Sequence, residues 1–317
     1  MATATATTRN SNSMAVRNVV RRVLAALAIA FLIFYALIQI TPFVLTVANS
    51  FKCDAAVENR PLPFIPRFET VECRDAEGSF IPAAAQVEGL TFYPSVDGYE
   101  RILDAQLPRW AFNTAFLSIV VTILRLILDS MAGYALARLK FPGNRVFFFI
   151  ILGVLMIPGV VLLVPRFLLL KELGLLNTYQ GYILTLAADA FGILLMKQFF
   201  ENIPKEIEEA AMVDGASRFT IFFRIVLPMA TPALTALTIF SFQGNWNNFM
   251  DALIILGGNT DLFNLPLGLT VLRGSGQDIQ YDLVLAGSVL TTIPIAIIFF
   301  FFQRYFVEGI SYSGLKG

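Results

Sequence analysis

The stretch Pro204–Pro228 reads PKEIEEAAMVDGASRFTIFFRIVLP, and its first half is acidic and rich in helix-forming residues. Pro204 suits the first position of a helix, where its missing N–H leaves no hydrogen bond unmade. The glutamates that follow favour the positive end of a helix dipole. Asp214-Gly215 then predicts the end of this helix, because glycine adopts the left-handed conformation of a C-cap at little cost. The carboxylates in the first turns are Glu206, Glu208 and Glu209.

The second half of the same stretch predicts a second, apolar helix. Ser217 is a suitable N-cap, and Pro228 ends the helix or kinks it. The aromatic and aliphatic positions between them are Phe219, Phe222, Phe223 and Ile225. The whole stretch is therefore expected to form a helix–turn–helix with one polar and one apolar end, placed between hydrophobic segments.

The composition of the chain indicates an integral membrane protein. Of its 317 residues 56% are hydrophobic and only 15% are charged, against about 25% charged residues in soluble domains. The formal net charge is zero, which gives nucleic-acid binding no electrostatic support. The sequence contains no His and only two Cys, so histidine bases and Cys/His metal clusters are excluded.

The N-terminal region predicts a tail, one membrane span and a long loop. Residues 1–22 read as a disordered cytoplasmic tail. The apolar run 23–48, at roughly 25 residues, is long enough to cross a bilayer and too long for a signal-peptide core. Residues 49–110 form a polar loop outside the membrane that contains Cys53 and Cys73. A disulfide between them would stabilise the fold by about 3 kcal/mol in the chain-entropy model, and two free thiols are the alternative.

Residues 111–303 predict a core of five further membrane spans, followed by a cytoplasmic tail over 304–317. We expect these spans near 112–137, 146–164, 182–200, 229–256 and 283–302, with the polar loop 201–228 between the fourth and the fifth. Pro158-Gly159 interrupts the third span, and residues 167–175 are expected to form a short interfacial helix.

Three ionisable residues fall inside these predicted spans. Arg125 and Asp129 are four residues apart and therefore share a face of one helix, and Asp189 lies near the middle of another span. Ionisable groups in a span usually face protein or water. We interpret the Arg125–Asp129 pair as structural or as a partner contact. For Asp189, a structural carboxylate and a ligand contact both remain open.

The distribution of basic residues predicts the orientation. With the N-terminus inside, the short outer loops hold only Arg166, Lys171 and Arg273, and the inner segments hold many more Lys and Arg. This bias supports an even number of spans, both termini in the cytoplasm and a cytoplasmic 201–228 loop.

At this point the residues carry a family resemblance. Glu209-Ala210-Ala211, Gly215 and Ile225-x-Leu227-Pro228 match, in type and spacing, the E-A-A-x3-G-x9-I-x-L-P signature of bacterial ABC importer permeases. Further segments resemble the carbohydrate, maltose-type branch, and within it the smaller permease partner. They are NTAF at 113–116, AGYALARLKFPG at 132–143, LGLLNTY at 173–179 and IPKEIEEAA at 203–211.

The resemblance implies a subunit of the bacterial inner membrane that pairs with a second, homologous permease. Two ATPase subunits would hold ATP and Mg²⁺, and this chain would have no cofactor of its own. An extracytoplasmic solute-binding protein would deliver the sugar. The helix–turn–helix would couple the ATPases to the membrane helices. The residues assigned to this role are Glu208, Glu209, Ala210, Ala211, Asp214, Gly215, Phe219, Ile225, Leu227 and Pro228.

A polar run in the fifth span suggests a substrate pathway. Amide side chains donate and accept hydrogen bonds to sugar hydroxyls, and an indole offers a face to a sugar ring. Polar glue between helices is the alternative. The candidates are Gln243, Asn245, Trp246, Asn247 and Asn248, together with Asp189, and Asp251 departs from the large apolar residue that the resemblance leads us to expect.

The expected protein is thus an all-α integral membrane protein with six transmembrane helices and a cytoplasmic coupling helix–turn–helix. No glycine-rich loop with a Lys for nucleotide phosphates occurs in the sequence, so the energy must come from another subunit. Permeases for a polyol or glycerol-phosphate-type solute share these motifs. An ion-coupled secondary transporter and a membrane scaffold are the readings from other classes.

Overall fold

The computed structural model describes residues 4–52, 96–104, 106–272 and 280–314. The chain divides into two compact units, Met1–Gly98 and Tyr99–Gly317. Within the described ranges every regular element is a helix. The loop that contains Cys53 and Cys73 lies outside these ranges, so the predicted disulfide stays a prediction.

The first unit contains one long helix, α1 (Ala4–Asn49). Its segment Val20–Asn49 contains an 18-residue window with a mean hydropathy of 2.6 and is long enough to span a membrane, which agrees with the predicted span 23–48 to within a few residues. The structure differs from the predicted disordered tail, because α1 already begins at Ala4.

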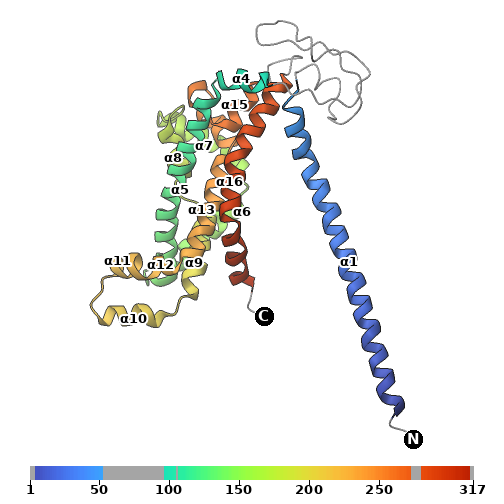
Figure 1. The fold of residues 1–317 in the computed structure, drawn as a ribbon. Helices are drawn as coiled ribbons and strands as arrows, with labels where there is room; N and C mark the ends of the chain where they lie inside the picture. Colours follow the sequence, from blue (N-terminus) through green and yellow to red (C-terminus); the bar gives the residue numbers. More distant parts are fainter. Residues whose placement is uncertain (1–3, 53–95, 105, 273–279, 315–317) are drawn as a thin grey trace, which may run out of the picture. The chain divides into compact units, whose positions relative to one another are not determined.

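The second unit is a bundle of helices with several short pieces at its two ends (Figure 1). The short helix α4 (Asp97–Asp104) precedes it, inside the predicted loop 49–110. The long helices are α5 (Leu107–Arg138), α9 (Ala190–Asn202), α13 (Thr231–Trp246) and α16 (Tyr281–Gly314). The shorter ones are α6 (Asn144–Met156), α7 (Leu163–Glu172), α8 (Tyr179–Leu186), α10 (Lys205–Val213), α11 (Arg218–Ile221), α12 (Leu227–Met229), α14 (Met250–Leu256) and α15 (Leu265–Leu272).

Helix α5 is the central element of this bundle, because it packs along both α9 and α13, and α13 in turn packs on α16. Residues of α5 contribute to two buried apolar clusters. One includes Trp110, Leu117 and Tyr182. The other includes Tyr134 and Phe200 and lies at the end where α10 and α11 project (Figure 1). The α10–α11 hairpin is therefore mounted on a buried apolar base.

The span count agrees with the prediction at the level of fold class. Four described helices are long and apolar enough to cross a membrane, and the number rises to six if each of two bent helix pairs is one span. The predicted third span is one of these pairs, since α6 and the segment Gly159–Glu172 meet at 98°. Pro158 explains the break, because proline cannot donate the backbone hydrogen bond that would continue α6. The interfacial helix predicted over 167–175 is α7, and it begins four residues earlier.

Two other predicted spans are broken. The fourth consists of α8 and α9, separated at residues 187–189. The fifth, expected near 229–256, contains a break as well, because α13 ends at Trp246 and α14 begins at Met250. Asn side chains explain the second break, since they compete with the helix for backbone groups. The Asn248 side chain accepts from the N–H of Asp251 at 3.1 Å.

Candidate coupling hairpin and substrate pathway

The stretch Pro204–Pro228 forms the predicted helix–turn–helix, the coupling hairpin, made of α10, a turn and α11. Pro204 is the N-cap, one position before the predicted one. Gly215 has φ of +82° and ends α10 as expected, with the N–H of Ala216 donating to the carbonyl of Ala211 at 2.9 Å. The Ser217 hydroxyl caps α11 by accepting from the N–H of Thr220 at 3.2 Å. The local sequence therefore predicts where the two helices of this hairpin begin and end.

After α11 the chain passes through a π-helical segment, η2 (Phe222–Val226), into α12. Pro228 gives the physical reason, because its ring has no N–H and clashes with the carbonyl one turn earlier. Beyond Pro228 the axis bends by 79° between the segment Arg218–Met229 and α13. Pro228 thus bends the chain between the hairpin and the bundle, as the sequence predicts.

Glu208 attaches the hairpin to α5 from inside the protein. Its side chain is only 5% exposed, and its Oε1 lies 2.9 Å from Nε of Arg138, which is 3% exposed. These two atoms are not aligned as a hydrogen bond, so the contact is an ion pair. The Tyr134 hydroxyl donates to the other carboxylate oxygen at 3.0 Å, and Arg218 approaches that oxygen to 3.8 Å. The Glu208 carboxylate is therefore paired within this chain.

Arg138 also holds the end of α9. Its Nη2 donates to the carbonyl of Phe200 at 2.6 Å and to the carbonyl of Ile203. These carbonyls stand at the C-terminus of α9, where the helix leaves them without partners and where a cation is favourable. One guanidinium therefore connects α5, α9 and α10. The sequence did not predict this role for Arg138, because nothing in it shows which carboxylate and carbonyls the guanidinium meets.

The opposite side of the hairpin is exposed. Val213 and Phe219 are 87% and 69% exposed. Phe222, by contrast, is buried in the base of the hairpin at 4%. The remaining residues assigned to coupling are exposed at Glu209, Ala210, Asp214, Gly215 and Pro228 and half-buried at Ala211, Ile225 and Leu227. The structure thus divides the assigned residues into an outward set and a buried set.

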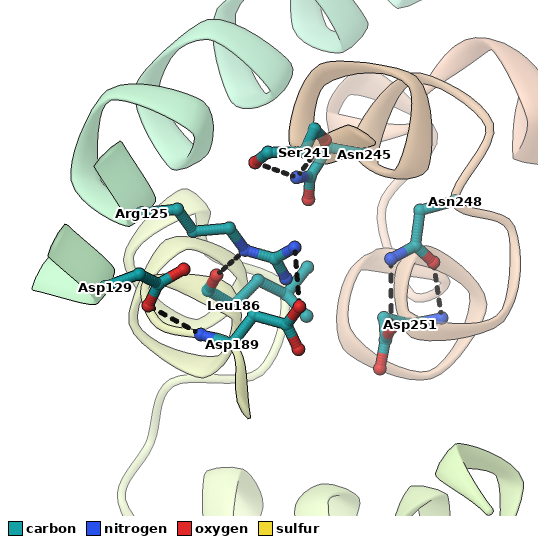
Figure 2. Close-up of polar contacts among 8 residues, drawn as sticks. All are labelled: Arg125, Asp129, Leu186, Asp189, Ser241, Asn245, Asn248 and Asp251. Carbon is teal, nitrogen blue, oxygen red and sulfur yellow. Dashed lines mark hydrogen bonds and ion pairs between the residues drawn. The ribbon is translucent and has the colours of Figure 1, made fainter. Parts of the chain in front are cut away.

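A second polar contact holds the break between α8 and α9 (Figure 2). Nε of Arg125 donates to the carbonyl of Leu186, the last residue of α8, at 2.8 Å. The Asp129 carboxylate accepts from the N–H of Asp189, the N-cap of α9, at 3.0 Å. The charges match the helix ends, since a cation sits at a C-terminus and an anion at an N-terminus. The expectation of a structural role fits this geometry, although the partners are backbone groups rather than each other.

Asp189 itself is more exposed than Arg125 and Asp129. Its side chain is 37% exposed, and Arg125 is 4.0 Å away. In Figure 2 its carboxylate points away from the backbone of α9, next to the Arg125 guanidinium. A half-exposed carboxylate at a helix break is suited to face water or a polar ligand.

The polar run of α13 does not share one environment. Asn245 is buried and donates to the carbonyl of Ser241 at 2.7 Å. Trp246 is also buried, with its indole N–H donating to the carbonyl of Thr291 in α16 at 3.2 Å. Gln243 and Asn247 are exposed, and Asn248 is half-buried. Within this chain, Trp246 therefore makes a polar contact between helices and Asn245 bonds within its own helix, and only the other three are accessible.

Asn248 belongs to a cluster that the sequence did not predict. It donates to the Asp251 carboxylate at 2.9 Å, and Arg166 from α7 forms an ion pair with the same carboxylate at 2.7 Å. The unexpected Asp251 is explained by this partner, because a carboxylate in an apolar environment needs a charge or a donor. The pairing joins α7 to α14 across 85 residues, a separation that local sequence patterns do not report.

The loop before α15 is fixed to the N-terminal half of α5. Asn113 donates to the carbonyls of Asp261 and Phe263, both at 2.8 Å. The Trp110 indole donates to the carbonyl of Thr260 at 3.0 Å. The residues 257–261 themselves stay exposed. This loop is therefore hydrogen-bonded to α5 and exposed, at the end of the bundle opposite the hairpin (Figure 1).

Comparison with known proteins identifies the family. The family described as the binding-protein-dependent transport system inner membrane component matches residues 129–312. The chain belongs to this family. The match begins at Asp129 and includes the coupling hairpin, the polar run and the 257–264 loop, so the geometry above is that of a permease component of a transport system.

Named relatives resemble this permease over most of its length. The arabinooligosaccharides transport system permease protein AraQ of Halalkalibacterium halodurans is 43% identical over 209 residues, which cover 66% of this chain and 74% of that protein. The diacetylchitobiose uptake system permease protein NgcG of Streptomyces coelicolor is 31% identical over 292 residues, covering 90% and 87%. The inner membrane ABC transporter permease protein YcjP of Escherichia coli is 33% identical over 207 residues, covering 65% of this chain and 73% of that protein.

A solved structure confirms the fold. A chain from a bacterial ABC transporter involved in the import of the acidic polysaccharide alginate superposes on this permease with a TM-score of 0.70 at 26% identity. The superposition covers 90% of this chain and 97% of that one. The permease is thus an all-helical, multi-pass component of an inner-membrane ABC transporter, as its sequence predicts.

Proposed function

We propose that this permease forms half of the transmembrane pathway of an ATP-driven importer for a sugar that an extracytoplasmic solute-binding protein delivers. Relatives with the names arabinooligosaccharides permease and diacetylchitobiose uptake permease support a sugar substrate. The second half of the pathway would come from a homologous permease, and two ATPase subunits would bind ATP and Mg²⁺. Both termini and the coupling hairpin would lie in the cytoplasm, in line with the excess of Lys and Arg in those segments.

The exposed face of the hairpin is the observation that carries the coupling role. Phe219 and Val213 are large apolar side chains that face away from the bundle, and Glu209 lies exposed on the same hairpin. Exposed apolar residues with polar neighbours are typical of an interaction site. A cleft on the ATPase that accepts an aromatic side chain and offers a basic group would complement this face.

The pathway would be lined by the accessible polar residues rather than by the whole polar run. Gln243, Asn247, Asn248 and Asp189 supply amides and a carboxylate that can bond hydroxyl groups. Arg166 and Arg125 already stand beside Asp251 and Asp189. Since each cation has a carboxylate beside it, a neutral sugar is favoured over a glycerol-phosphate-type solute.

The two readings from other classes have less support. An ion-coupled transporter would use Asp129 and Asp189 as ion or proton sites, but it leaves the match to the binding-protein-dependent transport family without an explanation. A scaffold that only recruits a cytoplasmic protein would leave the exposed amides of α13 without a role. It predicts unchanged transport when Asn247 is replaced.

The test is purification of the tagged permease, followed by uptake measurements. We expect a second permease and an ATPase to co-purify, and proteoliposomes with the binding protein to take up one member of a panel of labelled oligosaccharides only when ATP is enclosed. Phe219→Glu should remove the ATPase from the preparation, because burying a carboxylate in an apolar cleft is costly. Phe223→Glu is a control for added charge at another exposed Phe of the same segment. Uptake by this chain alone, abolished by an uncoupler, would contradict the proposal.

A further inference from the structure

The attachment of the coupling hairpin to the bundle is asymmetric. On the side of α11 the chain continues through the π-helical segment and a 79° bend into α13. On the side of α10 it connects to α9 through Ile203 and Pro204, and both residues have extended backbone angles or cap geometry rather than helical ones. Neither connection is a continuous α-helix, so the backbone alone would let the hairpin swing relative to the bundle.

A group of buried side chains spans this flexible connection. Arg138 on α5 is in an ion pair with Glu208 on α10 at 2.9 Å, and the same guanidinium donates to the carbonyls of Phe200 and Ile203 at the end of α9. Tyr134, one turn earlier on α5, donates to the Glu208 carboxylate at 3.0 Å. Both charged side chains are at most 5% exposed. A buried charge whose partner moves away is left uncompensated, which is strongly unfavourable.

We infer that Arg138, Glu208 and Tyr134 form a joint that makes the coupling hairpin move as one body with α5 and α9. The inference rests on the proposed function, since it names the side chains that carry hairpin movement into the bundle. Glu208 and Arg138 are positioning residues in this sense, because they act on the pathway through α5 and α9.

The position of α5 indicates which contacts such a movement would change. The same helix carries Arg125 and Asp129, which hold the break between α8 and α9 beside Asp189. A displacement of α5 and α9 at the hairpin end therefore reaches the contacts at this break. Hydrogen bonds within α10 do not reach α5. Glu208 is the buried residue of α10, and its ion pair with Arg138 makes this connection.

Spin-label distances test the joint in the assembled complex. Labels would be placed at Lys205→Cys on α10 and Ile123→Cys on α5, both exposed, with Cys53 and Cys73 replaced by Ser. In the wild-type background we expect the distance between the labels to be the same without nucleotide and with ATP, Mg²⁺ and vanadate. In Glu208→Gln, which keeps an acceptor for Tyr134 but loses the charge, nucleotide should shift and broaden the distance distribution.

Two further variants separate this role from general effects. Arg138→Lys keeps a cation but cannot contact the carboxylate and both carbonyls together, so it should behave like Glu208→Gln. Glu206→Gln removes an exposed carboxylate from the same helix and should behave like the wild type. A nucleotide-dependent distance in the wild type as large as that in Glu208→Gln, or an unchanged distance in both, would overturn the joint.

Hydrogen exchange on the full chain in detergent tests the joint without any ATPase. The amides of α10 and of the last turn of α9 should exchange about tenfold or more faster in Glu208→Gln than in Glu206→Gln, because losing one partner of a buried ion pair leaves the other charge uncompensated. Equal exchange rates would count against the joint. If no ATPase accompanies the chain, the proposed function fails, and the exchange rates alone decide whether the joint exists.

Discussion

Glu208 and Glu209 are adjacent carboxylates in opposite environments. Glu208 is buried against Arg138 and Tyr134, and Glu209 is exposed. A helix places consecutive residues about 100° apart, so one side chain turns to the bundle and the next turns outward. Substitutions at the two positions are therefore expected to have different effects. A change at Glu208 should alter the position of the hairpin relative to α5, and a change at Glu209 should weaken contact with a partner.

Gly192 gives a residue-scale prediction of stability. A Cβ atom at this position of α9 would overlap the Asp129 carboxylate and come within 2.9 Å of Cδ1 of Leu237. Both neighbours are buried, so Gly192→Ala should lower the free energy of unfolding by about 1–3 kcal/mol through overpacking. Gly153→Ala is the matched control, because nothing lies within 4 Å of that Cβ position. Thermal unfolding of the purified proteins measures both, and an unchanged midpoint for Gly192→Ala would contradict the packing.

At the scale of elements, broken helices are the common feature of this permease. The 98° bend after α6, the break between α8 and α9, the 79° bend at Pro228 and the gap between α13 and α14 interrupt or border three predicted spans, the third, the fourth and the fifth. Proline explains two of them, and polar side chains that bind free backbone groups explain the others. Irregular backbone at membrane depth is tolerated where it is buried in protein or faces a water-filled cavity. The breaks therefore indicate where the partner permease or the pathway would lie.

The turn of the coupling hairpin gives an element-scale prediction. Gly215 has a positive φ, and a β-branched residue there is strained by about 1–3 kcal/mol. Gly215→Val should therefore distort the angle between α10 and α11 and abolish ATP-driven uptake while membrane insertion and expression are retained. Gly215→Asn is the control, because Asn tolerates the left-handed region, and it should keep most of the uptake. Wild-type uptake in Gly215→Val would argue against the hairpin as the coupling element.

At the scale of the whole molecule, the helix α5 connects the exposed 257–261 loop at one end of the second unit with the hairpin at the other end. α5 runs from the Asn113 contacts with the exposed 257–261 loop, past the Arg125 contact at the α8–α9 break, to Tyr134 and Arg138 under the hairpin. Each of these contacts is made by a polar side chain to another element. A movement of α5 would thus be communicated along the entire second unit.

Orientation provides the prediction for the whole molecule. Fusions of a fluorescent protein that folds only in the cytoplasm should be bright at both termini, and alkaline phosphatase, which is active only outside, should be inactive there. The same phosphatase fused within the 49–110 loop should be active. The physical reason is the retention of Lys- and Arg-rich segments on the cytoplasmic side. An active phosphatase at either terminus would overturn the proposed topology.

The sequence by itself determined the class of protein, the positions of most hydrophobic segments and the coupling hairpin. These features depend on local causes: apolar runs long enough for a bilayer, glycine at a left-handed cap, serine at an N-cap and proline at a bend. The spacing of Glu209, Gly215 and Pro228 also indicated the family that the comparison confirmed. Nothing in those patterns requires knowledge of which helices touch.

Only the tertiary structure decided which polar residues are buried and with what partners. Arg138 with Glu208 and Arg166 with Asp251 are 70 and 85 residues apart in the chain, and Trp246 bonds a carbonyl of α16. A local pattern cannot assign such pairs, because a carboxylate or an indole has the same sequence signature whether it faces water, a substrate or another helix. The packing of α5 against α9 and α13 resolves that ambiguity, since it decides which of these groups loses water and must find a partner inside the protein.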